Sequence, residues 1–202
     1  MNAPAFPCPQ PPDGERRTWL IATGAATGAA AVAATVPLVS SFAPSERAKA
    51  MGAAVELDIS DLPPGGMKTV EWRGKPVWVQ RRTPEMIAAL KGHDAQLADP
   101  ASARDGLPGP LRNPGRSIRP DVFVAVGICP HLGCSPTAVP PDGGHPGVGG
   151  DWQGGFFCPC HGSTFDAAGR VFKNKPAPTN LEIPPHRYAS DTWLVIGESE
   201  PA

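Results

Sequence analysis

Cys129-Pro130-His131-Leu132-Gly133-Cys134 and Cys158-Pro159-Cys160-His161-Gly162-Ser163 are the two stretches of sequence that decide the fold of this 202-residue chain. In each stretch a cysteine and a histidine stand two or three positions apart, so each can deliver one thiolate and one imidazole, while proline and glycine favour tight turns. One further cysteine is left over in each stretch. The pattern therefore predicts a site with mixed sulfur and nitrogen ligands, carried by two loops.

Two common uses of cysteine do not match this spacing. Structural zinc sites usually combine a CxxC pair with an HxxxH pair or with a second CxxC, whereas this chain pairs CxH with CxxH. A thioredoxin-like dithiol needs CxxC, which neither stretch contains. A zinc or interaction module is the non-redox alternative for these two stretches. Analysis of the protein for iron and labile sulfide would exclude or support it.

The pattern CxHxGC followed by CxCHG resembles that of the Rieske iron-sulfur family, and every defining position is matched. The resemblance implies one [2Fe-2S] cluster per chain, with Cys129 and Cys158 on one iron and His131 and His161 on the other. Two neutral imidazoles in place of two anionic thiolates make such a cluster easier to reduce than an all-cysteine cluster. The implied chemistry is one-electron transfer.

Further residues near the two motifs gain expected roles from the same resemblance. Cys134 and Cys160 match cysteines that form a disulfide between the cluster loops, a bond that needs an oxidising compartment. Ser163 matches a serine that donates a hydrogen bond to a bridging sulfide. Leu132 is expected to shield the cluster and to pack at a docking surface, and Pro176 belongs to a segment that covers the cluster from a third side.

Two positions depart from the family pattern. Lys175 stands where the family's GPAP segment has glycine, and Phe165 stands where many high-potential members have tyrosine. The tyrosine hydroxyl donates to a cysteine ligand, and hydrogen bonds to sulfur stabilise the more negative reduced cluster. We therefore expect a lower reduction potential than in tyrosine-bearing relatives.

The segment FKNKPAPTNLEIPPHRY, residues 172–188, is similar to the Rieske subunit of ubiquinol-cytochrome c reductase, the cytochrome bc complex, especially in proteobacterial forms. This resemblance implies that the chain accepts one electron from ubiquinol, coupled to proton release, with His161 and His131 as the catalytic residues. It implies transfer to a c-type cytochrome and partnership with cytochrome b and a membrane-bound c-type cytochrome in a dimeric assembly. The Rieske subunit of another periplasmic oxidoreductase, such as arsenite oxidase, is the alternative.

Residues 18–42 are predicted to form a transmembrane anchor. No charged residue occurs between Thr18 and Ser45, and at ~1.5 Å per residue this stretch is longer than the ~30 Å hydrocarbon core of a bilayer. Arg16 and Arg17 form a twin-arginine pattern that is typical of export of folded proteins, and by the positive-inside rule residues 1–17, with Cys8, stay cytoplasmic. The predicted location is the bacterial inner membrane with a periplasmic C-terminal domain. A cleaved signal peptide is the alternative.

Residues 55–202 are predicted to form a mainly β domain, an antiparallel Rieske-type sandwich with a cluster-binding subdomain at about residues 127–180. A flexible tether, residues 43–54, precedes it. Unwinding a helix at residues 45–53 would lengthen that stretch by ~15 Å, and a passive linker is the alternative. Apolar and β-branched runs predict strands at 55–59, 67–72, 76–80, 121–126 and 192–196. Residues 84–91 favour a short helix with proline in its first turn, and residues 92–120, rich in proline and glycine, favour a loop.

Composition excludes two classes of protein. The net charge of -1, from 18 basic and 19 acidic residues, offers no positive footprint for nucleic acid. Five cysteines are too few for a disulfide-dense scaffold of this length, and 23 glycines with 27 prolines indicate a loop-rich domain. His93, His145 and His186 show no ligand-like spacing, so we expect ordinary surface histidines.

Overall fold

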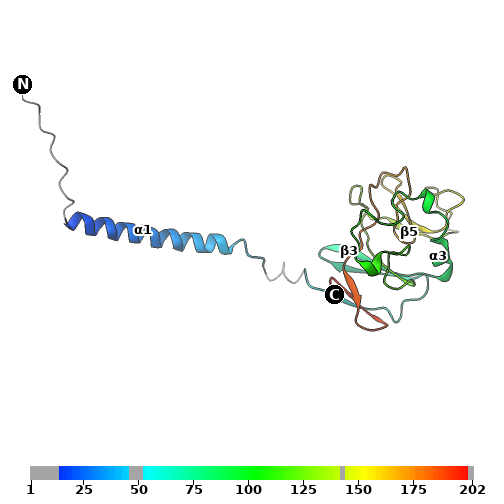
Figure 1. Cartoon of the computed structure of the whole chain (residues 1–202), viewed down its shortest axis with the longest axis horizontal. Helices are drawn as coiled ribbons and strands as arrows, with labels where there is room; N and C mark the ends of the chain where they lie inside the picture. Colours follow the sequence, from blue (N-terminus) through cyan, green and yellow to red (C-terminus); the bar gives the residue numbers. More distant parts are fainter. Residues whose placement is uncertain (1–13, 46–51, 142–143, 200–202) are drawn as a thin grey trace, which may run out of the picture. The chain divides into compact units, whose positions relative to one another are not determined.

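A computed structural model describes residues 14–45, 52–141 and 144–199 of the chain (Figure 1). The chain divides into two compact units, Met1–Lys49 and Ala50–Ala202, which are described separately. Part of the predicted tether, residues 46–51, and Cys8 lie outside the described residues.

The first unit contains one long helix, α1 (Gly14–Ser40), of 27 residues. At 1.5 Å per residue it is ~40 Å long, and its length and composition suffice to cross a membrane. The hydroxyls of Thr23 and Thr35 donate to the carbonyls of Trp19 and Ala31 one turn earlier, at 2.8 and 2.7 Å. These bonds satisfy polar groups that hydrocarbon would leave unpaired. The helix begins four residues before the predicted anchor and ends two residues before its predicted end.

The second unit is built from three antiparallel sheets of three strands in its described part, with orders β1-β9-β8, β2-β3-β4 and β5-β6-β7. The predicted mainly β fold with one N-terminal apolar helix is thus confirmed. The strands are β1 (Val55–Asp58), β2 (Met67–Trp72), β3 (Lys75–Arg81), β4 (Val122–Val126), β5 (Thr137–Val139), β6 (Gly155–Phe157), β7 (Thr164–Asp166), β8 (His186–Tyr188) and β9 (Trp193–Ile196).

Strands β3 and β4 lie between two hydrophobic cores. Successive side chains of a strand point to opposite faces, so Val77 and Val124 join the core formed with β1, β2 and β9, whereas Trp78 and Phe123 join the core beneath β6 and β7. Both faces of β4 are covered, which explains its uninterrupted apolar sequence VFVAV. Through the second core, the β5-β6-β7 sheet thereby packs against the face of β3 and β4 that is opposite the first core.

The remaining elements lie between β3 and β4. Helix α3 (Pro84–Ala89) begins after Thr83, whose side chain accepts a hydrogen bond from the Met86 amide, and it ends two residues before the predicted end. The predicted loop, residues 92–120, contains the 3-10 turns η1 (Asp94–Gln96) and η2 (Gly109–Leu111). Leu97, Leu107 and Leu111 of this segment are buried, so it is packed against the domain and does not merely connect two strands.

The prediction that His93 and His186 are surface histidines is wrong. Both side chains are buried. The ring of His93 lies 3.1 Å from the Asp166 carboxylate, and Nδ1 of His186 lies 2.9 Å from the carbonyl oxygen of Pro184. Each partner satisfies one ring nitrogen, which lowers the cost of burying the imidazole. Burial lowers the pKa of His186. His145 is half-buried and stacks against Phe157, with ring centroids 4.4 Å apart.

Candidate metal centre

The two cysteine-histidine loops have the same backbone hydrogen bonds. The carbonyl of the first cysteine accepts from the glycine four residues later, and its amide donates to the carbonyl five residues later. The first loop shows this for Cys129 with Gly133 and Cys134 at 3.0 and 2.7 Å, and the second for Cys158 with Gly162 and Ser163 at 3.0 and 2.8 Å. The chain therefore presents two equivalent turns, each beginning at a cysteine.

Glycine is required where each turn closes. Gly133 and Gly162 have φ angles of +82° and +75°, in the left-handed region that side-chain-bearing residues rarely adopt. This conformation turns the backbone back on itself two residues after His131 in the first loop and one residue after His161 in the second. The motif glycines thus have a local structural reason, and they hold the cysteine and the histidine of each loop on one side.

Four potential ligand side chains meet where the two loops approach each other. Cys129 and Cys158 are buried at 1% and 2% exposure and are not part of a disulfide. The rings of His131 and His161 lie edge to face, with centroids 4.8 Å apart, and His161 is exposed while His131 is half-buried. The site therefore has two thiols on its inner side and two imidazoles on its outer side.

Burial raises the pKa of the Cys129 thiol. Hydrogen bonds from the His131 amide and the Ser163 hydroxyl act in the opposite direction, because they stabilise a thiolate. A buried thiol with such donors around it is suited to bind a metal ion, whose charge compensates the thiolate.

A disulfide between Cys134 and Cys160 connects the two loops, with Cα atoms 6.6 Å apart. This is the pairing that the family resemblance implies. The sulfur atoms of Cys134, Cys158 and Cys160 lie within 4.8 Å of one another. Two of these three belong to the disulfide and cannot act as thiolate ligands, so the available donors are the two free cysteines and the two histidines.

A third segment borders the site. The amide of Ala177 donates a 3.0 Å hydrogen bond to the Ser163 hydroxyl oxygen, and both residues are buried. Pro176 beside it is exposed, and Leu132 at the turn of the first loop is 71% exposed. The proline-rich segment is thus joined to the second loop through Ser163. An apolar side chain projects into solvent next to the histidines.

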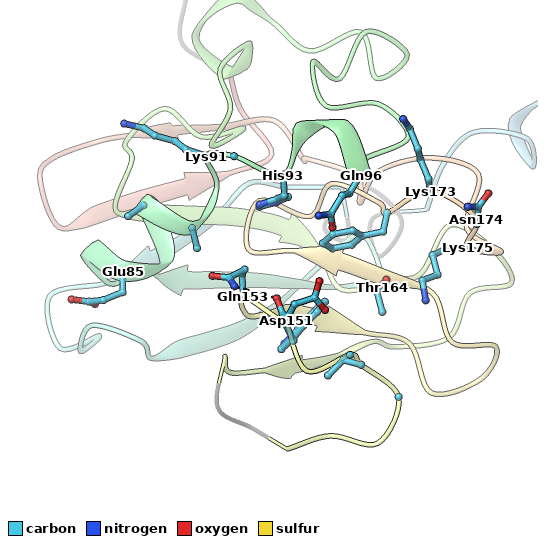
Figure 2. Close-up of a pocket in the computed structure, with 18 residues that line it drawn as sticks. Glu85, Lys91, His93, Gln96, Asp151, Gln153, Thr164, Lys173, Asn174 and Lys175 are labelled. Atoms are coloured by element: carbon cyan, nitrogen blue, oxygen red, sulfur yellow. Dashed lines mark hydrogen bonds between the residues drawn. The ribbon is translucent and has the colours of Figure 1, made fainter.

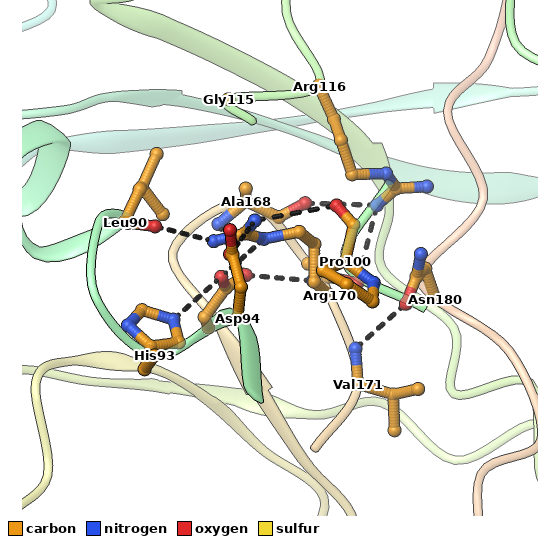
Figure 3. Close-up of polar contacts among 12 residues, drawn as sticks. Leu90, His93, Asp94, Pro100, Gly115, Arg116, Ala168, Arg170, Val171 and Asn180 are labelled. Atoms are coloured by element: carbon orange, nitrogen blue, oxygen red, sulfur yellow. Dashed lines mark hydrogen bonds and ion pairs between the residues drawn. The ribbon is translucent and has the colours of Figure 1, made fainter. Parts of the chain in front are cut away.

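Buried polar side chains support this arrangement from the inside (Figure 3). The Asp166 carboxylate accepts hydrogen bonds from the amides of Ala168 and Arg170 at 2.9 and 2.8 Å, and from Nε of Arg170 at 2.7 Å. The Arg170 guanidinium also contacts Asp94 at 2.9 Å and the Leu90 carbonyl at 2.8 Å. This network ties β7, which directly follows the second loop, to the segment after α3.

A second group of polar side chains fixes the end of the proline-rich segment. The side-chain oxygen Oδ1 of Asn180 accepts a hydrogen bond from the Val171 amide at 2.9 Å. The side-chain NH₂ group of Asn180 faces Asp99, Ser102 and Asp105. Arg116, 1% exposed, donates to the carbonyls of Ala168 and Leu181. Our sequence reasoning missed these residues. The available signal was the DAAGR turn, residues 166–170, in which a carboxylate can bond to its own backbone.

Two thiolates and two imidazoles are the ligands of a Rieske [2Fe-2S] cluster, in which one iron is bound by cysteines and the other by histidines. The buried cysteines and the more exposed histidines of this site fit that division. By donor chemistry alone the same set can also bind tetrahedral zinc. The comparison with known proteins separates these readings.

Residues 114–185 match the family model described as "Rieske [2Fe-2S] domain". The chain is 56% identical over 184 residues to the ubiquinol-cytochrome c reductase iron-sulfur subunit of Allochromatium vinosum, covering 91% of this chain and 88% of the relative. It is 42% identical to the same subunit of Rhodospirillum rubrum, covering 92% and 94%. A solved structure of a hyperthermophilic respiratory Complex III aligns at 28% identity and TM-score 0.45, covering 86% and 97%.

The β fold, the two-loop site and the domain match define a Rieske-type protein whose cofactor is a [2Fe-2S] cluster. The chain belongs to the family of ubiquinol-cytochrome c reductase iron-sulfur subunits, which are components of an oxidoreductase complex.

Proposed function

We propose that this subunit accepts one electron from ubiquinol at the surface formed by His131 and His161 and passes it to a c-type cytochrome. The observation that carries the proposal is the position of the two rings. They meet at the surface, 4.8 Å apart, above two buried thiols and beside the exposed Leu132. A bound substrate can therefore contact the histidines without entering the protein.

The proposed ligands are Cys129 and Cys158 on one iron and His131 and His161 on the other. When bound, the cluster supplies a one-electron redox centre. An imidazole uses one ring nitrogen for a metal and keeps the second for a hydrogen bond. The outer position of the two histidines fits this division, because their second nitrogens need a partner from outside the chain.

His161 is the proposed contact for quinol, since it is the more exposed of the two histidines. When the second ring nitrogen of His161 carries no proton, a quinol hydroxyl would donate a hydrogen bond to it and would give it that proton as the electron leaves. Leu132 packs against the partner surface and excludes water from the contact. Quinol loses two electrons and this chain takes one, so another subunit, by family resemblance cytochrome b, must take the other.

The proposed topology follows from α1. Arg16 and Arg17 lie in its first turn, and the positive-inside rule places them in the cytoplasm. The second unit is then periplasmic, where the Cys134–Cys160 disulfide is stable. Twin-arginine export of the folded domain and retention of the helix as an anchor complete the proposal. Residues 43–54 would let the domain move between donor and acceptor within a dimeric complex.

The test is electron paramagnetic resonance of the purified, reduced complex with and without an inhibitor of the quinol site. We expect a rhombic spectrum that changes when the inhibitor displaces quinol from His161. Analysis of the same sample should find iron and labile sulfide. A spectrum that does not respond to the inhibitor would contradict contact between quinol and this subunit.

A further inference from the structure

The surface around the metal centre carries an unusual distribution of charge. Three segments form this surface, residues 128–136, 158–163 and 173–178, which we call the tip loops. None of them contains an acidic residue, and their charged side chains are Lys173 and Lys175. Both lysines are exposed. The tip therefore has a positive edge although the whole chain has a net charge of -1.

Neither ammonium group is neutralised by a carboxylate within the part of the chain that the structure describes. Lys173 Nζ donates to the Ala95 carbonyl at 2.7 Å, a neutral partner, and its amide donates to the carbonyl of Gln96 at 2.8 Å. On the side of Pro130, two of the three cations pair with carboxylates, whereas the exposed Arg104 has no carboxylate partner in the described part of the chain. Lys75 bonds to Glu182 at 2.9 Å, and Arg116 bonds to Asp105 at 2.7 Å.

The lysines lie where the tip meets a groove of about 1070 Å³ (Figure 2). The groove is lined by Lys91, Lys173 and Lys175 and by the acidic Glu85 and Asp151. Figure 2 shows Lys173 and Lys175 on one flank and Glu85 on the opposite flank. In the β5-β6-β7 sheet, Thr137, Phe157 and Thr164 lie at the same end, and the tip loops adjoin this end. The connection from β5 to β6, which contains Asp151, leaves the opposite end of the sheet. The two lysines therefore lie both in the tip loops and at the edge of the groove, whereas the acidic residues of the groove lie outside the tip loops.

We propose that Lys173 and Lys175 form a cationic contact that docks a carboxylate-bearing, water-exposed surface of the electron acceptor. The inference rests on the proposed function and adds the chemistry of the partner. Quinol is neutral, so two ammonium groups do not select it. Lysine is strongly hydrated and costly to bring near hydrocarbon, so this edge fits an aqueous acceptor better than a quinol site within the membrane.

Exposed charges act on encounter more than on the final complex. Complementary patches raise the rate of association, and salt suppresses the effect because the screening length is ~8 Å at physiological ionic strength and ~3 Å at 1 M. Two lysines separated by one residue can thus orient the tip toward an acidic surface before contact. Leu132 and His161 then make the close contact.

Zero-length carbodiimide cross-linking of the purified complex tests the contact directly, without relying on turnover. We expect amide bonds between Lys173 or Lys175 and carboxylates of the c-type cytochrome, identified by mass spectrometry and lost at 1 M salt. Lys91 is the internal control, since it lines the groove but lies outside the tip loops. Cross-links that lead only to cytochrome b, or none from either tip lysine while Lys91 reacts, would overturn the proposal.

Kinetics of the complex give the second test. At low ionic strength, Lys175→Gln and Lys173→Gln should each slow haem reduction by about two- to fivefold, whereas Lys91→Gln, with the same charge change, should not. The difference should vanish at high salt. Lys173→Arg, which keeps the charge and can keep a hydrogen bond to the Ala95 carbonyl, should transfer electrons at the wild-type rate.

The two tests distinguish this proposal from the function beneath it. If quinol fails to reduce the c-type haem through the wild-type subunit, the proposed function fails. If wild-type transfer proceeds and the glutamine variants keep both its rate and its salt dependence, the function stands and the docking role of the lysines is overturned.

Discussion

The Ser163 hydroxyl oxygen accepts a hydrogen bond from the Ala177 amide at 3.0 Å, which joins the second cysteine-histidine loop to the proline-rich segment. Because the oxygen accepts this bond, the hydroxyl proton is free to point elsewhere. Among its neighbours is the Cys129 sulfur, whose thiolate form the hydroxyl favours. One buried serine therefore connects the covering segment with the electronic properties of the centre.

Replacing Ser163 by alanine should lower the reduction potential. A hydrogen bond to a charged group contributes roughly 1.5–3 kcal/mol, which corresponds to roughly 60–130 mV for one electron. The bond stabilises the more negative reduced state, so its loss shifts the potential downward. An EPR-monitored redox titration measures the shift. Ser117→Ala is the matched control, since Ser117 is buried but bonds to Arg82. A potential that stays constant or rises contradicts the role assigned to Ser163.

Replacing Phe165 by tyrosine should raise the potential. Phe165 is fully buried in the core that contains both free cysteines, so an added hydroxyl is close to sulfur acceptors. A hydroxyl that bonds to a cysteine ligand again favours the reduced state. The potential and the thermal midpoint should be measured together. A hydroxyl without a partner would cost about 1–3 kcal/mol of stability and leave the potential unchanged, and that result would refute the prediction.

Removal of the disulfide should loosen the site. Cys134 and Cys160 are 26 residues apart in the sequence, and closing a loop of this size stabilises a fold by about 3–4 kcal/mol in the chain-entropy model. The double variant Cys134→Ser/Cys160→Ser should lose its visible iron-sulfur absorbance at a lower temperature. A reductant should have the same effect on the wild-type protein and none on the variant. Equal midpoints for both proteins would show that the disulfide does not stabilise the site.

Acid should destabilise the domain through Asp166. Burial alone would raise the pKa of this carboxyl, but hydrogen bonds from His93 and Arg170 and the charge of Arg170 lower it below its ordinary 3.8. A depressed folded-state pKa means that the stabilisation is present above the unfolded pKa and is lost as pH falls toward the folded value. Stability should therefore decrease as pH falls below about 4.

The variant Asp166→Asn tests this assignment. It should unfold up to about 3–5 kcal/mol more easily at pH 7, because Arg170 loses its buried partner charge and keeps only the more exposed Asp94, and its stability should depend less on acid pH. Asp61→Asn is the control, since Asp61 is exposed. An acid transition of wild-type size in Asp166→Asn would assign the pH dependence to other carboxyls.

Stiffening the tether should slow transfer without altering the centre. Residues 45–53 were predicted from sequence to change length by ~15 Å between helical and extended forms. Proline substitutions there should reduce the rate of c-type haem reduction by the complex while the EPR spectrum stays the same. Unchanged turnover would remove domain movement from the mechanism.

The local turns of the two motifs could be predicted from the sequence more readily than the fold around them. Proline and glycine in CxHxGC and CxCHG favour tight turns, and Gly133 and Gly162 have the positive φ angles that such turns need. The strands at 67–72 and 121–126 were predicted well because their apolar patterns are long. Strands β5 to β8 have three residues each, which is too short for an alternating apolar pattern to mark them in the sequence.

The burial of His93 had no local signal either. Its partner Asp166 is 73 residues away in sequence, and only the fold brings the two together. The same reason applies to residues 92–120, which are held by bonds from Arg170 to Asp94, from Asn180 to Asp99, and from Arg116 to Ala168, rather than by a repeated apolar pattern. Polar contacts between residues far apart in the sequence were therefore the features that the sequence predicted least well.

Pulsed EPR of the reduced complex tests most directly whether two cysteines and two histidines bind the cluster. With histidine labelled by ¹⁵N, the account predicts strong coupling of the unpaired electron to two inequivalent imidazole nitrogens, and loss of one coupling, or of the centre, in His131→Ser and His161→Ser. A reduced centre without histidine nitrogen coupling, or a protein that contains zinc and no labile sulfide, would contradict it.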